Sequence, residues 1–206
     1  MRLYIIRHGE TPWNTELRLQ GQTDIALNEN GRLLAKQTAY ALQSVPFDAA
    51  FTSPLIRAVE TAEIILNGRN IPLIRDERIR EIGFGVMEGR KMTREEREDP
   101  SSEFYAFFHA PEKYRPPEGG ETIDDLFART GDFLDELRNR KEWCEKTILV
   151  SSHGAAVRSL LANISRCGRR DFWAGRVPPN CSVSIAELLD GKWIIKEQDR
   201  VYYENI

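Results

Sequence analysis

Residues 2–9 read Arg-Leu-Tyr-Ile-Ile-Arg-His-Gly, and this stretch decides the fold that we expect. Positions 2–6 form a short apolar run, which is typical of a strand buried inside a sheet. Arg7 and His8 follow directly, and the glycine behind them lets backbone or a ligand approach closely. A comparable order occurs at 147–154, where Thr-Ile-Leu-Val-Ser-Ser precedes His-Gly. The sequence therefore predicts two buried strands that each end close to a histidine.

Strand patterns alternate with helix patterns along the rest of the chain. The further strands that we expect are 48–52, 72–74, and a hairpin of 183–188 and 192–197 around the turn dipeptide Asp190-Gly191. The helices that we expect are 31–44 after Asn28-Glu29-Asn30, Ser53-Pro54 to about Leu66, Thr122 to about Lys141, and Ala155 to about Ile164. This alternation predicts an α/β fold, a three-layer α/β/α sandwich with a mostly parallel sheet and an antiparallel edge strand.

One segment departs from the alternation. Residues 93–118 are rich in charge, proline and aromatic rings. Two interpretations stay open: short helical pieces pinned to the body by their rings, or a lid over a site. We expect a single domain over residues 1–206, in which about 90–120 form an inserted cap of helix and loop.

Composition excludes several classes of protein. The chain has 206 residues, of which 41% are hydrophobic and 30% charged, as in an ordinary globular protein. Its formal net charge of -3 gives no reason to expect a nucleic acid or a membrane as partner. Cys144, Cys167 and Cys181 have no paired spacing, so we expect neither a disulfide framework nor a zinc site. The apolar start is too short for a signal peptide, and a cytoplasmic protein is expected. The sequence makes no prediction of oligomeric state.

The residues that follow three predicted strands suit phosphate chemistry. Arg7 and His8 follow the first strand, Arg57 the second, and His153 the fourth, and ligands of open α/β sheets bind at such strand ends. Guanidinium groups bind phosphate oxygens, and a neutral imidazole is a competent nucleophile towards phosphorus. Glu81 is a candidate proton donor for the leaving oxygen. Taken singly, each of these residues is more often a structural histidine or a surface charge.

Ordered motifs along the chain together resemble one family. Arg-His-Gly-Glu-Thr-x-x-Asn at 7–14 resembles the signature of the histidine phosphatase superfamily, which includes the cofactor-dependent phosphoglycerate mutases. Further agreeing stretches lie at 19–24, 27–31, 52–62, 79–89, 119–122 and 150–154. Each stretch alone is weak evidence, but the ordered set is specific and spans almost the whole chain.

The resemblance implies a role for each matched position. His8 resembles the nucleophile that becomes phosphorylated, and Glu81 resembles the acid that protonates the leaving group and then activates water. Arg7, Arg57 and His153 resemble a clamp for the phosphate oxygens. The positions that resemble substrate contacts are Asn14, Gln20, Gly21 and Gly154. Family members hydrolyse phosphate esters without a metal or an organic cofactor, so none is expected here.

The resemblance favours a phosphatase that acts on small organic phosphates. The mutases have longer chains with an insert after the acidic residue, whereas Ile-Gly-Phe-Gly-Val-Met-Glu-Gly at 82–89 and the stretch 107–114 resemble broad-specificity bacterial phosphatases. A mutase-type phosphotransferase is the alternative, and a non-catalytic phosphate-binding module is a third. An aromatic cap would select substrates by packing. Arg90-Lys91 and Arg169-Arg170 could help to bind a second anionic group, although surface charge is their simpler interpretation.

Overall fold

The computed structural model describes residues 1–173 and 176–203. Six strands form one sheet in the order β3-β2-β4-β1-β5-β6. Their bounds are β1 Arg2–Arg7, β2 Ala49–Thr52, β3 Leu73–Arg75, β4 Thr147–Ser152, β5 Val183–Leu189 and β6 Lys192–Arg200. Strands β1 to β4 are parallel, and β5 and β6 add an antiparallel hairpin at one edge.

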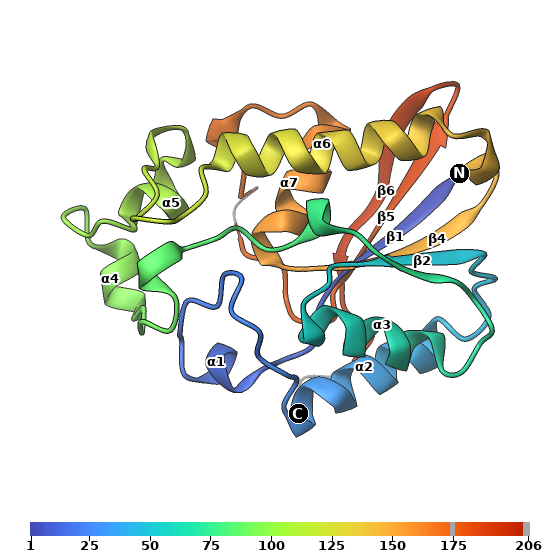
Figure 1. The fold of residues 1–206 in the computed structure, drawn as a ribbon, viewed down its shortest axis with the longest axis horizontal. Helices are drawn as coiled ribbons and strands as arrows, with labels where there is room; N and C mark the ends of the chain where they lie inside the picture. The colour runs from blue at the N-terminus through green and yellow to red at the C-terminus, as the bar shows by residue number, and fades with distance from the viewer. Residues whose placement is uncertain (174–175, 204–206) are drawn as a thin grey trace.

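Helices cover both faces of the sheet, with α6 and α7 on one face and α2 and α3 on the other (Figure 1). The α-helices are α1 Pro12–Thr15, α2 Glu29–Ala41, α3 Ile56–Leu66, α4 Arg94–Glu98, α5 Tyr105–His109, α6 Ile123–Asn139 and α7 Gly154–Ser165. The predicted three-layer sandwich is therefore confirmed. Within the described residues, no helix is long and apolar enough to cross a membrane.

Strand β1 shows why an uninterrupted apolar run belongs at the centre of such a sheet. Leu3 and Ile5 pack into the core with α6 and α7, whereas Tyr4 and Ile6 pack into the core with α2 and α3. All four side chains are buried. Successive side chains of a strand point to opposite faces, so covering both faces leaves no place for a polar residue.

Capping and turn residues that the sequence shows account for several of the observed element boundaries. Thr122 and Asp125 form the expected capping box of α6, and Asn28 caps α2 through the Gly31 N–H. Asp190 and Gly191 both have positive φ, 49° and 72°, as a two-residue hairpin turn of type I′ requires.

Two helix boundaries differ from the prediction. Helix α3 begins at Ile56, two residues after Pro54, because Ser53 Oγ accepts the Leu55 N–H (3.3 Å) and the chain turns before the helix. Helix α2 ends at Ala41 instead of residue 44, shortly before Pro46, which has no N–H to continue a helix.

The 90–118 segment lies beyond the sheet, at the left of the view in Figure 1. It contains α4, α5 and a short 3-10 turn over Pro111–Lys113. Phe104, Phe107 and Tyr114 are buried in one cluster with Leu126 and Phe127 of α6. The segment therefore consists of short helical pieces pinned by their rings, as the first interpretation has it. Arg97, Phe107 and Phe108 also place it beside the site that the second interpretation expects it to cover.

A buried ion pair ties α7 to the last strand. Arg158 Nη2 lies 2.5 Å from Asp199 Oδ2, and the two side chains are 1% and 3% exposed. Arg158 Nε–H also donates to the Arg176 carbonyl oxygen (2.9 Å). The pair thus holds the chain that leads from residue 176 back into the sheet.

We expect Asp199→Asn to lower the free energy of unfolding by about 3 kcal/mol, since removing one partner leaves the Arg158 charge buried and unpaired. Asparagine suits the test because it tolerates the φ of 54° at this position. Urea denaturation measures the effect. Glu142→Ala, which removes a partner of the exposed Arg140, is the control and should change stability by less than about 0.5 kcal/mol. Equal effects of the two changes would contradict the prediction.

Candidate active site

The carboxyl ends of β1, β2 and β4 meet at one cavity of about 300 Å³. Eight of the nine predicted site residues line it: Arg7, His8, Asn14, Gln20, Gly21, Arg57, Glu81 and Gly154. The convergence follows from the sheet, because strands β1, β4 and β2 are parallel neighbours and deliver their following residues to the same edge.

His8 is held in one tautomer. Its side chain is buried, and its Nδ1–H donates to the Gly9 carbonyl oxygen (2.6 Å), which can only accept. Nε2 therefore keeps its lone pair. Burial, reinforced by the charges of Arg57 and Arg7, holds the pKa of His8 well below its ordinary value of 6.5. The imidazole is neutral at neutral pH and has the form that a nucleophile needs.

Arg57 is the most tightly held cation of the site. It is fully buried in the first turn of α3, as expected. Nη1–H donates to the Thr23 carbonyl oxygen (2.8 Å), and Nη2–H donates to that of Gly21 (2.7 Å). Nε–H donates to His153 Nδ1 (3.1 Å). Burial lowers the pKa of Arg57 to about 10, so it remains charged at neutral pH, and two of its five N–H groups stay available to a ligand.

Arg7 has a donor that no protein group uses. Its Nη1–H donates to the Pro178 carbonyl oxygen (2.5 Å). Its Nε is buried and has no hydrogen-bond partner among the described residues. A buried donor left without a partner costs about 1–3 kcal/mol, so an anion that enters the cavity would gain from this N–H group. Burial lowers the pKa of Arg7, and no carboxylate of the described residues forms an ion pair with it.

His153 lies behind the cavity wall. It is fully buried, and its ring centroid is 5.1 Å from that of His8. Nδ1 accepts from Arg57, so Nε2 carries the proton of the neutral ring and donates to Ser53 Oγ (2.7 Å). The structure thus brings His153 next to the other predicted residues, but protein groups occupy both of its nitrogens.

Glu81 is fastened to the N-terminus of α7. Its Oε1 accepts the backbone N–H groups of Ala155, Ala156 and Ile82 at 3.0–3.1 Å. Gly154 leaves the space in front of Glu81 open. A β-carbon at Gly154 would lie 3.6 Å from Glu81 Oε2 and 3.7 Å from Arg7 Nε, between the acid and the cation.

Asn14 and Gln20 are joined through Thr11. Thr11 caps α1 in a capping box with Asn14. Its Oγ1 lies 3.0 Å from Gln20 Oε1 and 3.2 Å from Asn14 Oδ1, so the hydroxyl can donate to either amide oxygen. These contacts use the acceptor oxygens of both amides. No residue in the described part of the chain accepts a hydrogen bond from the amide N–H groups of Asn14 and Gln20, and both side chains line the cavity.

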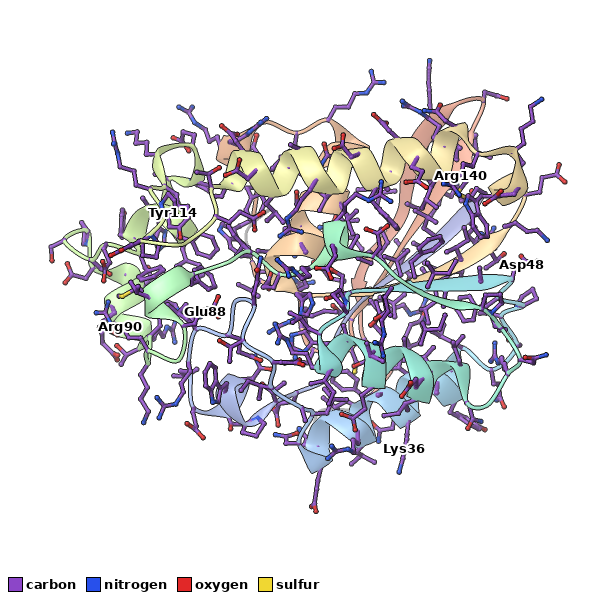
Figure 2. All side chains as sticks on the ribbon, in the orientation of Figure 1. Lys36, Asp48, Glu88, Arg90, Tyr114 and Arg140 are labelled. Atoms are coloured by element: carbon purple, nitrogen blue, oxygen red, sulfur yellow. The ribbon has the colours of Figure 1, made fainter. Side chains whose placement is uncertain are left out.

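Two organising residues were missed from the sequence, and the first is Glu88, labelled in Figure 2. Its carboxylate accepts the N–H groups of Gln22 (2.9 Å) and Phe84 (3.1 Å) and the Thr23 hydroxyl (2.5 Å). Gly21 has φ 50°, and a β-carbon there would lie 2.0 Å from Glu88 Oε1. Glu88 stands in the recognisable stretch 79–89, which was the available signal.

The second is Asn180, to which the sequence assigned no role. Its Nδ2 donates to the His8 carbonyl oxygen (3.0 Å) and to Asn14 Oδ1 (3.3 Å). It thereby couples the chain before β5 to His8 and to Asn14. No local pattern could have indicated this contact across the fold.

The rest of the wall includes four aromatic residues, namely Phe84, Phe107, Phe108 and Trp173. Trp173 is fixed by its Nε1–H, which donates to the Phe107 carbonyl oxygen (2.5 Å). Across residues 1–173 and 176–203, no group of three or more His, Cys, Asp or Glu side chains could hold a metal ion. The arrangement offers a neutral imidazole, four arginines (Arg7, Arg18, Arg57 and Arg97) and a carboxylate beside apolar side chains.

A family model described as the histidine phosphatase superfamily (branch 1) matches residues 3–200. This chain belongs to that family. The resemblance that the motifs indicated is therefore confirmed, together with the phosphatase class of hydrolase that it implied.

Relatives of this chain include proteins named as phosphatases and proteins named as phosphoglycerate mutases. The uncharacterized phosphatase PhoE of Bacillus subtilis is 33% identical over 193 residues, which cover 94% of this chain and 91% of the relative. The probable phosphoglycerate mutase GpmB of Erwinia tasmaniensis is 31% identical over 194 residues, which cover 94% and 88%. The solved structure of YhfR from Bacillus stearothermophilus is similar with a TM-score of 0.87 and 36% identity over 97% of each chain.

The two buried neutral histidines should lower the free energy of unfolding at acidic pH. The pKa of His8 and of His153 is held well below 6.5 in the folded protein, chiefly by burial and then by Arg57. The unfolded chain takes up both protons as the pH falls below about 6.5, and the folded protein does not. We expect each histidine to cost about 1.4 kcal/mol of stability between about pH 7.5 and about pH 5.5.

Urea denaturation at the two pH values measures this loss. The His8→Gln variant should lose about half as much stability as the parent protein over the same range. An identical loss in the variant and the parent would show that His8 takes up a proton in the folded protein as readily as in the unfolded chain.

Proposed function

We propose that this protein hydrolyses small organic phosphate monoesters through a phosphohistidine on His8. The observation that carries the proposal is the state of His8: it is buried, neutral, fixed with Nε2 unprotonated, and placed in one cavity with Arg7 and Arg57. Imidazole nitrogen, guanidinium clamp and carboxylate are the groups that phosphoryl transfer through a covalent intermediate uses.

The first step forms the phosphoenzyme. The lone pair of His8 Nε2 attacks phosphorus, a nitrogen–phosphorus bond forms, and the bond from phosphorus to the ester oxygen breaks. Glu81, in its protonated form, gives its proton to that oxygen, and the alcohol leaves. Arg7 Nε–H and the two available N–H groups of Arg57 stabilise the charge on the other phosphate oxygens.

The second step returns the enzyme to its starting state. Glu81, now a carboxylate, takes a proton from a water molecule as the water oxygen attacks phosphorus. The nitrogen–phosphorus bond breaks, inorganic phosphate leaves, and His8 is neutral again. Glu81 is suited to both steps because the α7 N–H groups hold Oε1 and leave Oε2 with a single long contact, 3.2 Å from Ala155 N.

We assign the remaining residues to binding and positioning. Asn14 and Gln20 offer amide N–H groups, and Gly154 offers space for the substrate. Gly21 admits the Glu88 carboxylate and accepts the Arg57 Nη2–H with its carbonyl oxygen. His153 positions Arg57 by accepting its Nε–H, and Ser53 positions His153 in turn. Direct contact of His153 with phosphate stays a prediction.

Two further statements belong to the proposal. A mutase-type transfer to a second substrate is the alternative, because relatives named as mutases match nearly the whole chain. The cytoplasm is the proposed compartment, since Cys144, Cys167 and Cys181 are free thiols and thiols persist in a reducing compartment.

We expect His8→Ala to abolish turnover and phosphoenzyme together. The measurement is rapid quenching with a labelled phosphate ester in excess chelator, which follows the acid-labile phosphoenzyme over time. His109→Gln, which changes a histidine of α5, is the control and should retain activity. Release of phosphate by His8→Ala at the parent rate would refute the nucleophile. A phosphoenzyme that persists until a phosphoglycerate acceptor is added would favour the mutase.

We expect Glu81→Gln to slow both chemical steps by about 10²- to 10⁴-fold, because glutamine accepts the same N–H groups but cannot transfer a proton. Single-turnover rates should fall most for esters with poor leaving groups, and decay of the phosphoenzyme should slow for every ester. A change in KM with unaltered single-turnover rates would contradict the acid–base role.

A further inference from the structure

Four arginines line the active-site cavity: Arg7, Arg18, Arg57 and Arg97. The proposed mechanism uses Arg7 and Arg57, and Arg18 is engaged with Glu16 and the Gly89 carbonyl oxygen. Arg97 is the remaining one. It comes from α4 in the 90–118 segment and lines the cavity with Phe107, Phe108 and Trp173. The guanidinium carbon lies 5.1 Å from the centroid of the Phe108 ring, which fixes its plane over an apolar surface.

No carboxylate neutralises Arg97 within the described residues. Glu96 is engaged with Arg90 and with the Thr93 N–H group. Glu98, on the other side, lies 3.4 Å from His109 Nε2. Arg97 Nε is buried and has no hydrogen-bond partner among the described residues. A half-buried guanidinium is thus left with unused donors on the wall of a cavity.

Arg7 and Arg97 both have a buried donor without a described partner. Both line the same cavity, and each has a buried Nε without a partner in the described part of the chain. Burial lowers the pKa of Arg97, so taking its charge out of water has a cost that no described group offsets. Arg7 binds the phosphate in the proposed mechanism, and an anion would likewise accept the unused Nε–H of Arg97.

The cavity has room for a substrate that reaches Arg97. It adjoins a second cavity of about 580 Å³, and the two share Arg97, Phe108, Trp173 and Val177 as wall residues. The shared aromatic rings suit an organic spacer, which would lie against them while its far end meets Arg97.

We propose that Arg97 binds a second anionic group of the substrate, so that the preferred substrates are phosphate monoesters with a carboxylate or a second phosphate on an organic spacer. This rests on the proposed function. It adds charge to a selectivity that the sequence assigned to packing. Arg97 is the residue that lines both cavities, whereas Arg170 lines the adjoining cavity alone. Arg97 is a specificity residue in this proposal and takes no part in the chemical steps.

The test compares matched substrates that differ only in the distant group. 4-Carboxyphenyl phosphate carries the second anion, 4-carbamoylphenyl phosphate is its neutral counterpart, and 1,4-phenylene bisphosphate replaces the carboxylate by phosphate. The variants are Arg97→Gln and Arg97→Lys. Arg94→Gln is the matched control, because Arg94 is an exposed arginine of the same helix.

In Arg97→Gln, kcat/KM for 4-carboxyphenyl phosphate should fall about 10- to 100-fold, the range for loss of a hydrogen-bonded charge pair. Most of the fall should lie in KM. The neutral counterpart should change by less than about 3-fold, Arg97→Lys should recover part of the loss, and Arg94→Gln should behave as the parent. The larger loss, on the carboxylate or on the bisphosphate, identifies the preferred anion.

Equal losses on the charged and neutral substrates, or no loss on either, would overturn the proposal. Failure of the proposed function looks different: the parent protein would then hydrolyse none of the three esters. In that case calorimetric binding of the non-hydrolysable 4-carboxybenzylphosphonate decides the matter. Weaker binding to Arg97→Gln than to the parent supports the anion site, and equal binding rejects it.

Discussion

The pairing of β1 with β4 is the constraint on which the site depends. The two strands run parallel in register from Arg2 opposite Thr147 to Arg7 opposite Ser152, and the ladder continues with the His8 N–H donating to the Ser152 carbonyl oxygen (2.9 Å). Paired strands lie about 4.8 Å apart. The residues that leave their ends must therefore stay close, and the rings of His8 and His153 are 5.1 Å apart. A slip of one residue would turn the nucleophile to the other face of the sheet.

Around this rigid centre the protein gathers positive charge that it does not neutralise. Arg7, Arg57 and Arg97 line one cavity, and none forms an ion pair with a carboxylate among the described residues. Arg57 is held by backbone carbonyl oxygens, which orient a guanidinium without cancelling its charge. Burial keeps His8 neutral, and the charges of Arg57 and Arg7 reinforce this. Burying these unpaired cations thus lowers the free energy of unfolding, and binding of a phosphate dianion would offset that loss.

The sequence predicted the parts of this protein that are specified locally. Apolar runs identify β1 and β4, capping residues such as Thr122 identify helix starts, and parallel order brings His8 and Arg57 to one edge. Family resemblance then supplied roles that spacing alone does not contain. The contacts of Asn180 and Glu88 were missed because each joins segments that meet only in the folded chain. The burial of His153 behind Arg57 escaped prediction for the same reason.

Arg97 could not have been singled out from the local sequence. In a charge-rich segment each charged residue has the pattern of solvated surface, and only the fold shows that this one lines a cavity. Its position also separates two tasks. The chemical groups stand at strand ends and helix starts, where a small displacement would cost rate. Arg97 stands on α4, a short helix of a segment held mainly by aromatic packing. Substitutions there can alter which anion is recognised without moving His8, Glu81 or Arg57. A site arranged in this way can change its substrate while the transfer of phosphate to the histidine stays the same.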